Sequence, residues 1–145
     1  MQNLTMQHCD EIKNKDVLFM PAGNGKTNFI DARDIAEVAA LVLSETGHRD
    51  RAYELTGAES YSYNKVAQML TDELKRPIHY ARPGFIRYMV YSLRQGMPFS
   101  FALVTGIIYT VARLGKADHY SPELATLLNR PARTLKTFIQ EHRKH

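Results

Sequence analysis

The chain has 145 residues, a length that suits one domain with a single hydrophobic core. Hydrophobic residues make up 44% and charged residues 23% of it, as in an ordinary soluble globular protein. The formal net charge is +4, and much of that surplus lies near the C-terminus, in RKH (143–145), Arg130 and Arg133. So small a surplus is typical of solvated surface, and we do not expect a nucleic-acid partner.

The sequence gives no sign of export or of a membrane span. Cys9 is the single cysteine, which excludes an intramolecular disulfide and favours a reducing compartment. The start MQNLTMQHCDEIKNKD lacks the basic and apolar regions of a signal peptide. The uncharged stretch 97–112 is shorter than the roughly 20 residues of a span and contains Pro98 and Gly106, which favours a buried helix. We expect a cytoplasmic protein with no membrane partner.

The first part of the chain predicts short strands around one helix. The runs DVLFMPA and KTNFID flank Gly-Asn-Gly, a pattern that predicts a hairpin or paired edge strands. A helix follows, with Asp34 as its expected N-cap, Glu37 as the capping-box partner and Gly47 as its end. Its apolar stripe is formed by Ile35, Val38, Ala39 and Val42.

A second strand–helix–strand unit follows. RAYELTG (51–57) predicts a strand closed by a glycine turn, and IHYARP predicts another short strand. Between them, Ser62 is the expected cap of a helix that Pro77 ends. One face of this helix carries Val66, Met69, Leu70 and Leu74.

Helices are predicted after Pro83. They are FIRYMVYSLRQG, FALVTGIIYTVARLG, SPELATLLNR with a Ser cap, and TLKTFIQEHRKH, which bears Leu135, Phe138 and Ile139. The predicted fold class is therefore α/β, with few short strands and a helical C-terminal half. We expect a single domain or fragment, with an α/β part at 1–82 and a helical part at 83–145.

The letters GKT (25–27) resemble the end of a Walker A loop. Such a loop needs a further glycine where this chain has Met20, and a helix directly after it. Because TNFID predicts a strand and the helix begins only near Asp34, both requirements fail. We interpret Gly23 and Gly25 as a tight turn that needs positive φ.

Other catalytic patterns are incomplete. Tyr61 and Lys65 have Tyr-x-x-x-Lys spacing, but a cap at Ser62 leaves Tyr61 outside the helix. Asp31 and Asp34 could act as acid and base, although capping already explains Asp34. Six scattered histidines and one cysteine show no metal-ligand spacing, so no metal is expected. Neither G-x-S-x-G nor G-x-G-x-x-G occurs.

Three segments together resemble the C-terminal half of NmrA-like, atypical short-chain dehydrogenase/reductases. These NAD(P)-binding proteins are also described as nucleoside-diphosphate-sugar epimerase-like or quinone-reductase-like. The segments are PAGNGKTNFIDARDIAEVAALVLSE, AYELTGAESYSYNKVAQMLTDELKRPIHY and LATLLNRPARTLKTFIQEH. MQNL also resembles a segment that follows the family's sixth sheet strand. The resemblance implies the substrate-side part of a Rossmann-type fold.

The chain also departs from that family. The Gly-rich loop, the first parallel strands and the residues that grip the dinucleotide do not precede MQNL. We therefore expect a truncated reading frame, an internal-start product or an excised fragment. The family's cofactor is NAD(P), and we expect none bound by this chain alone. Lys65 stands where relatives commonly carry an acidic residue, and Lys75 where they usually have Gly.

The resemblance also implies substrate-binding residues. Asn3 would lie near the nicotinamide, Phe29 and Asp31 on the substrate side, and an apolar lid would be formed by Phe85, Tyr88 and Met89. Structural roles stay open for all of them: a loop residue for Asn3, core packing for Phe29, a turn or salt bridge for Asp31, and helix packing for the lid residues.

The resemblance implies the substrate-side half of an NAD(P)-dependent oxidoreductase-like protein that is inactive alone. In that family a hydride passes between the nicotinamide and a small electrophile such as a quinone. The alternative is a non-catalytic regulatory or protein-interaction module that uses the helical half. Because 51–57 would be an uncovered edge strand, we expect a homo-oligomer or a missing N-terminal half as partner, beside a small-molecule substrate.

Overall fold

The structure is a computed structural model that describes residues 1–142, so the basic stretch RKH (143–145) lies outside the described residues. The helices are α1 (Asn3–Met6), α2 (Cys9–Lys15), α3 (Ala32–Ser44), α4 (Tyr63–Leu74), α5 (Phe85–Arg94), α6 (Phe99–Arg113), α7 (Glu123–Leu128) and α8 (Leu135–His142). The strands are β1 (Val17–Leu18), β2 (Lys26–Asn28), β3 (Ser60–Ser62) and β4 (His79–Tyr80).

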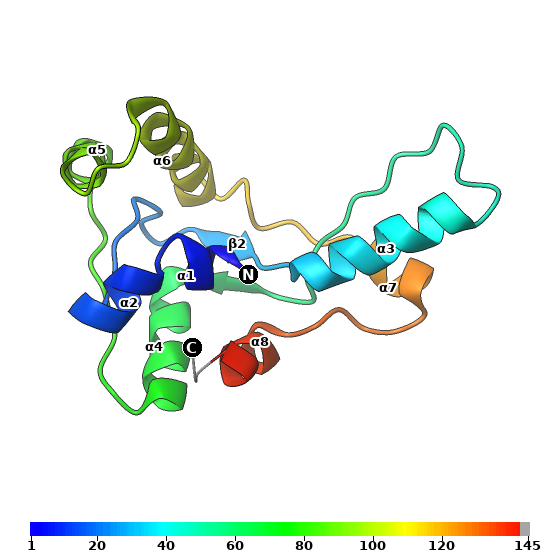
Figure 1. Cartoon of the computed structure of the whole chain (residues 1–145), viewed down its shortest axis with the longest axis horizontal. Coiled ribbons are helices and arrows are strands. Elements are labelled where there is room, and N and C mark those ends of the chain that lie inside the picture. Colours follow the sequence, from blue (N-terminus) through cyan, green and yellow to red (C-terminus); the bar gives the residue numbers. More distant parts are fainter. Residues whose placement is uncertain (143–145) are drawn as a thin grey trace.

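The molecule consists of a body and an arm (Figure 1). In the body, α4 packs against α8 and against β1, and α1 and α2 lie beside it. The α5–α6 pair lies at one end of the body, and α3 extends away from it with α7 alongside. Of the helices predicted after residue 83, α5 and α6 therefore form a hairpin, whereas α7 and α8 pack against helices of the first part.

The strands form two separate pairs, which makes the predicted hairpin wrong. β1 runs parallel to β4, with Leu18 opposite Tyr80. β2 runs antiparallel to β3, with Thr27 opposite Tyr61. The part 18–22 of the run DVLFMPA is buried on both sides, since the consecutive residues Leu18, Phe19 and Met20 are all buried, and it therefore lies inside the body rather than at an edge beside β2.

The strand predicted at 51–57 is also wrong, because this segment is irregular in the structure. The end of this segment, at Gly57, is held by the side chain of Asn28 instead of by hydrogen bonds to a neighbouring strand. The Asn28 amide donates to the Gly57 carbonyl oxygen, and Asn28 Oδ1 accepts from the Gly57 backbone nitrogen. A side chain at position 57 would not fit, since its Cβ would lie 1.8 Å from the Phe29 oxygen.

Two short helices, α1 and α2, occur where the sequence predicted none. Neither N-cap residue makes a side-chain capping bond. Contacts distant in sequence hold them instead: the Met1 amino group donates to the Ile30 oxygen at 2.6 Å, and Arg76 donates to the Ile12 oxygen at 2.7 Å. Because tertiary contacts decide these helices, local pattern did not reveal them.

The predicted N-cap of α3 is wrong. The cap is Asp31, whose side chain accepts from the Arg33 backbone nitrogen at 2.9 Å. Asp34 lies in the first turn, fully buried, where its carboxylate is paired with Arg130 at 2.7 Å and with Arg133. Glu37 pairs with the same two arginines instead of closing a capping box. The start of α3 is thus fixed by ion pairs to the distant 130–133 segment.

The predicted helices α4, α5, α6, α7 and α8 are confirmed, although the N-cap of α7 is Pro122 and not the predicted serine. Ser62 caps α4, its hydroxyl accepting from the Lys65 nitrogen at 3.4 Å, and Tyr61 lies outside the helix in β3. The inner face of α4 buries Val66 and Leu70. The inner face of α8 buries Leu135, Phe138 and Ile139. Periodicity thus identified the helices that cover the core.

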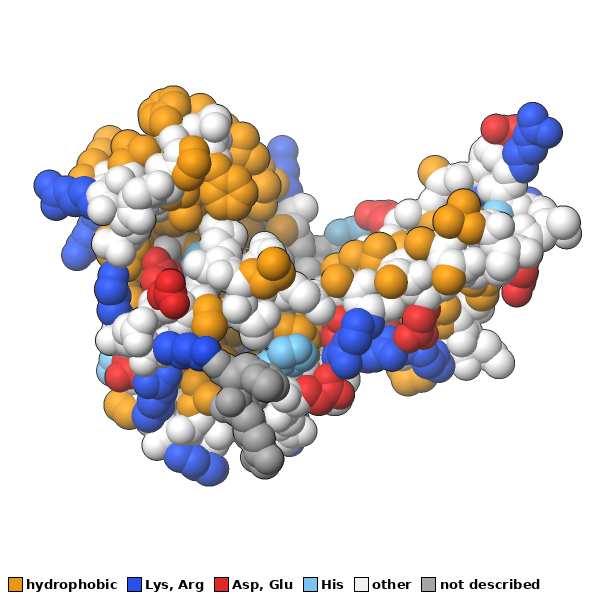
Figure 2. Space-filling view, in the orientation of Figure 1, with side chains coloured by type: hydrophobic (Ala, Val, Ile, Leu, Met, Phe, Trp, Pro, Cys, Tyr) orange, Lys and Arg blue, Asp and Glu red, His pale blue; other side chains and the backbone are white. Residues whose placement is uncertain are grey.

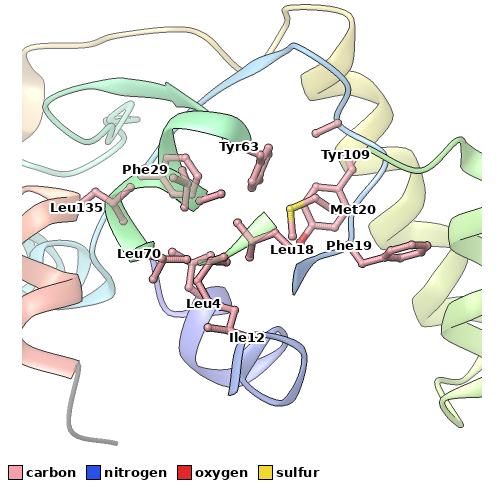
Figure 3. Close-up of a cluster of buried hydrophobic side chains, with 14 of the residues drawn as sticks. Leu4, Ile12, Leu18, Phe19, Met20, Phe29, Tyr63, Leu70, Tyr109 and Leu135 are labelled. Carbon is pink, nitrogen blue, oxygen red and sulfur yellow. The ribbon is translucent and has the colours of Figure 1, made fainter. Parts of the chain in front are cut away.

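The buried core joins helices α1, α2, α4, α5, α6 and α8 with β1 and the segments beside the strands. Figure 3 shows side chains from these elements converging, among them Leu18, Phe29, Tyr63 and Tyr109. A smaller cluster around Val38 and Leu124 holds the arm together. The elements of the body therefore share one core, and the arm has its own.

The Gly-Asn-Gly segment is a turn, and β2 follows it, so the exclusion of a Walker A loop is confirmed. Gly23 has the expected positive φ of 56°. Gly25 does not need one; it allows close packing, since a Cβ there would lie 1.9 Å from the Ala112 carbonyl oxygen of α6. The turn thus seats α6 against the body.

The sequence predicted a buried helix at 97–112. Helix α6 is buried along one side only, so this prediction is correct for one of its faces. Ala102, Gly106 and Tyr109 face the body, whereas Val104 and Ile108 are 54% and 58% exposed. Figure 2 shows hydrophobic side chains gathered over the α5–α6 hairpin. None of the helices within residues 1–142 has the length and apolarity that a bilayer crossing demands.

Helix α4 ends at Lys75, whose φ of 56° places an L-residue in the left-handed region. We predict that Lys75→Gly raises the free energy of unfolding by about 0.5–1 kcal/mol, because glycine adopts this conformation without a Cβ clash. Urea denaturation followed by circular dichroism measures the change. The matched control, Lys65→Gly inside α4, should lower stability by a similar amount; a destabilised Lys75→Gly variant would contradict the prediction.

Candidate functional site

Two cavities lie on either side of α1. The inner cavity, of about 210 Å³, is bounded by α1, β2, the start of α4 and α6. The outer cavity, of about 600 Å³, is bounded by α1, α2, α5 and the start of α6. Asn3, Gln7 and His8 line both cavities. These residues of α1 and the turn after it therefore form the wall between the cavities.

Aromatic rings surround the inner cavity. Tyr63 meets Phe29 edge to face with ring centroids 5.7 Å apart, and it meets Tyr109 in the same way at 6.0 Å. Tyr88 packs behind Tyr109, also edge to face, at 6.0 Å. Such rings give an apolar lining of faces and edges, against which an aromatic ligand can stack or meet edge to face, with hydroxyl groups at defined points. The inner cavity thus suits an aromatic ligand.

The tyrosine hydroxyls of this site are protonated at neutral pH, and burial moves their pKa values further above it. Desolvation raises the pKa of Tyr63 to about 12 and raises the pKa of Tyr109 above its ordinary value, because both phenolates would lose their hydration. Both residues therefore remain hydrogen-bond donors at neutral pH.

A buried histidine connects the two cavities. The Nε2 atom of His8 lies 2.6 Å from the Tyr109 hydroxyl, and its Nδ1 atom lies 3.0 Å from Glu11 Oε2. His8 is buried, Tyr109 lines the inner cavity and Glu11 lines the outer one. The three side chains form one hydrogen-bonded chain through the wall.

One polar atom of the wall lacks a hydrogen-bond partner. The side-chain nitrogen of Gln7 is buried and finds no acceptor in the part of the chain that the structure describes. A buried donor without a partner costs roughly 1–3 kcal/mol. Because Gln7 lines both cavities, a ligand acceptor in either could satisfy it.

Three of the six predicted substrate residues line one or both of these cavities, but they do not share one site. Asn3 lines both cavities, Phe29 the inner one and Tyr88 the outer one. The Tyr88 hydroxyl lies 2.8 Å from Thr105 Oγ1 and is therefore also a packing contact between α5 and α6. Their role in substrate binding stays a prediction.

The other three predicted residues do not line either cavity. Asp31 is fully buried and accepts from the Gln2 amide at 2.8 Å and from Arg33 at 2.7 Å. Phe85 packs against Gly106 of α6, and Met89 packs against the main core. The contacts of these three residues are those of the structural roles that the sequence left open for them: a salt bridge for Asp31 and helix packing for Phe85 and Met89.

Five further site residues were not predicted from the sequence: Gln7, His8, Glu11, Tyr63 and Tyr109. The His-x-x-Glu spacing of 8 and 11 places both side chains on one helical face, but this signal requires a helix that local pattern did not predict. Within residues 1–142, His, Cys, Asp and Glu side chains form no group of three or more that could hold a metal ion.

Comparison with known proteins places the fold. No family model matches the chain. An NAD(P)H azoreductase from Xenophilus azovorans is 36% identical over 98% of this chain and 49% of its own length. The chain is homologous to NAD(P)H-dependent reductases. It spans about half the length of the curated relatives it matches, and the match lies in their C-terminal half.

Solved structures support this homology. The NADPH-dependent quinone oxidoreductase of Escherichia coli superposes with a TM-score of 0.89 at 24% identity, over 97% of this chain and 50% of its own, which shows a shared fold. The triphenylmethane reductase of Citrobacter, solved with NADP(H), gives 0.81 at 25% identity, over 88% and 44%. The predicted partial fold of an NAD(P)-binding reductase is therefore confirmed for this reductase homologue.

The buried carboxylate of Asp31 makes stability depend on pH. Burial alone raises its pKa, but hydrogen bonds from Arg33 and Gln2 outweigh that cost and lower the pKa below its ordinary value. A lowered folded-state pKa means that the stabilisation is present above the unfolded-state pKa and is lost as the pH falls through the folded-state value.

We therefore predict that Asp31→Asn flattens the decline of stability below about pH 4. Urea midpoints measured from pH 7 to pH 2 report this change. The control is Asp118→Asn at an exposed position, which should leave the acid limb of the curve in place. An Asp31→Asn curve parallel to wild type would refute the assignment.

Proposed function

We propose that this chain is the substrate-side half of an NmrA-like NAD(P)-dependent reductase whose inner cavity receives a flat, conjugated electrophile. The aromatic inner cavity, in a homologue of NAD(P)H-dependent reductases, is the observation that carries the proposal. Names of similar proteins refer to azo reduction, quinone oxidoreduction and triphenylmethane reduction. Azo compounds, quinones and triphenylmethane dyes all contain planar conjugated groups that suit such a surface.

The polar groups of the site fit a reduction. Hydride addition to N=N or C=O leaves negative charge on the neighbouring atom, and fixed hydrogen-bond donors stabilise such charge. The hydroxyls of Tyr63 and Tyr109 carry their protons at neutral pH, with pKa values raised by burial, and the Gln7 amide has a free donor in the described part of the chain. We propose that these three groups bind the acceptor atom.

We further propose that the dinucleotide is held by another segment or another chain. The Gly-rich fingerprint does not occur in the 145 residues. Since backbone amides of that loop grip the pyrophosphate in Rossmann folds, affinity for the dinucleotide should be weak here. Under this proposal the 145-residue chain has no hydride-transfer activity by itself.

An interaction module is the second candidate. The outer face of the α5–α6 hairpin exposes Ile86, Val104 and Ile107, and exposed apolar patches mark interaction surfaces. No strand forms at 51–57, so the structure gives no support for self-association by strand pairing at that segment. We propose the α5–α6 hairpin instead as the surface that binds a partner or a second copy. This candidate requires no ligand in the inner cavity.

We predict that azobenzene binds the chain in the inner cavity. Ile108 lines that cavity at its exposed side, so Ile108→Trp should fill it and weaken binding at least about tenfold. The matched control is Ile107→Trp, at a position that is similarly exposed but does not line the cavity. NMR shifts of labelled tyrosines, followed during titration, measure the affinity.

Absence of azobenzene binding, or equal affinities of the two tryptophan variants, would reject the inner cavity as a ligand site. The interaction module would then be favoured, and sedimentation of wild type against Ile107→Asn would test it. Loss of self-association in that variant would assign the hairpin to a protein interface.

We also predict that NADPH does not bind tightly to the 145-residue chain. Titration followed by nicotinamide fluorescence should give no saturation at micromolar protein, because the pyrophosphate has no glycine-rich loop to accept it. Saturable binding with enhanced fluorescence would contradict the proposed division of the reductase.

A further inference from the structure

The side chains of Glu11, His8 and Tyr109 are connected by hydrogen bonds, and the two ends of this connection lie in different cavities. Hydrogen bonds with a purely structural role do not require such a placement. Tyr109 meets the inner cavity and Glu11 the outer one, while His8 lines both. The distances of 2.6 and 3.0 Å are those of hydrogen bonds, so no gap interrupts the chain.

Another histidine–tyrosine pair in the molecule lacks this placement. His48 Nδ1 lies 2.7 Å from the Tyr53 hydroxyl in the loop of the arm. Neither residue lines any of the described cavities. The Tyr88 hydroxyl of the outer cavity also meets Thr105 of the inner cavity, but neither side chain carries a group that titrates near neutral pH. The Glu11–His8–Tyr109 link differs from it because it contains a histidine and a carboxylate, the side chains that take up and release protons near neutral pH.

We propose that Glu11, His8 and Tyr109 form a proton relay that carries a proton from the outer cavity to a ligand in the inner cavity. Glu11 and His8 are positioning and transfer groups, and Tyr109 is the residue that meets the ligand. That the proton goes to a substrate during reduction rests on the proposed function; the relay itself does not.

The transfer balances as follows for an azo substrate. A reduced nicotinamide held by the other part of the reductase would supply a hydride to one nitrogen of N=N and become oxidised, which would leave an electron pair on the second nitrogen. That nitrogen takes the Tyr109 hydroxyl proton. Tyr109 recovers a proton from Nε2–H of His8, while His8 Nδ1 takes the proton of a protonated Glu11 carboxyl group. The Glu11 carboxylate that remains is reprotonated by a hydronium ion of the outer cavity, which becomes water.

Proton exchange at Tyr109 tests the relay without any turnover. The chain is labelled with ¹³C at the ζ carbon of tyrosine and dissolved in equal parts of H₂O and D₂O. A hydroxyl that exchanges quickly gives one averaged ζ-carbon line, and a slow one gives two. Azobenzene is then added to close the inner cavity to water.

In wild type, Tyr109 should keep one averaged line with azobenzene bound, because the proton arrives through His8. His8→Gln and Glu11→Gln should slow this exchange at least about tenfold and split the line. Asp10→Asn, an exposed carboxylate change beside the outer cavity, and the Tyr88 line in every sample are the controls that should not change.

The outcomes separate the two proposals. With azobenzene bound, equal Tyr109 exchange in wild type and both variants overturns the relay. If azobenzene leaves the Tyr63 line unshifted, the proposed function fails, and the relay is tested with Ile108→Trp, whose indole fills the inner cavity in place of the ligand. In that background His8→Gln and Glu11→Gln should slow Tyr109 exchange at least about tenfold, and equal exchange overturns the relay. Should His8→Gln not fold, Glu11→Gln, at a partly exposed position, decides alone.

Discussion

The buried hydrogen bond between His8 and Tyr109 is the contact on which the site depends. It joins side chains 101 residues apart, one after α1 and one in the middle of α6. Without it the histidine would be a buried polar group with an unpaired nitrogen, at a cost of roughly 1–3 kcal/mol. Because it fixes α1 against α6, it also creates the wall that divides the inner from the outer cavity.

The carboxylates of Asp31, Asp34 and Glu11 have different roles. Asp31 accepts from Gln2 and Arg33, which ties the N-terminus to α3, and Asp34 binds the 130–133 segment to the same helix. Both are fully buried and their hydrogen-bonding capacity is taken up by these partners. Glu11 differs, because it combines a buried partner with a side facing the outer cavity. It is thus placed for exchange with water.

Sequence predicted the parts of the fold that local rules decide. Ser62 followed by the stripe of α4 required no distant contact, and the same holds for α5, α6 and α8. Asp34 was misassigned because a cap and a buried ion-pair partner use the same residue type, and distant Arg130 and Arg133 decide between them. The contact between His8 and Tyr109 could not be predicted from the sequence. The two residues are far apart along the chain, and no local pattern predicts α1, which positions His8.

A relay through the wall would allow the inner cavity to be dry during hydride transfer. Water in the cavity would screen the charge that Tyr63 and Tyr109 are placed to stabilise, and its exclusion strengthens those interactions. A reduction nevertheless consumes a proton, which must enter from somewhere. Delivery through His8 from the outer cavity separates the proton's path from the space that the substrate fills. The two-cavity arrangement therefore reconciles proton supply with a desolvated reaction site.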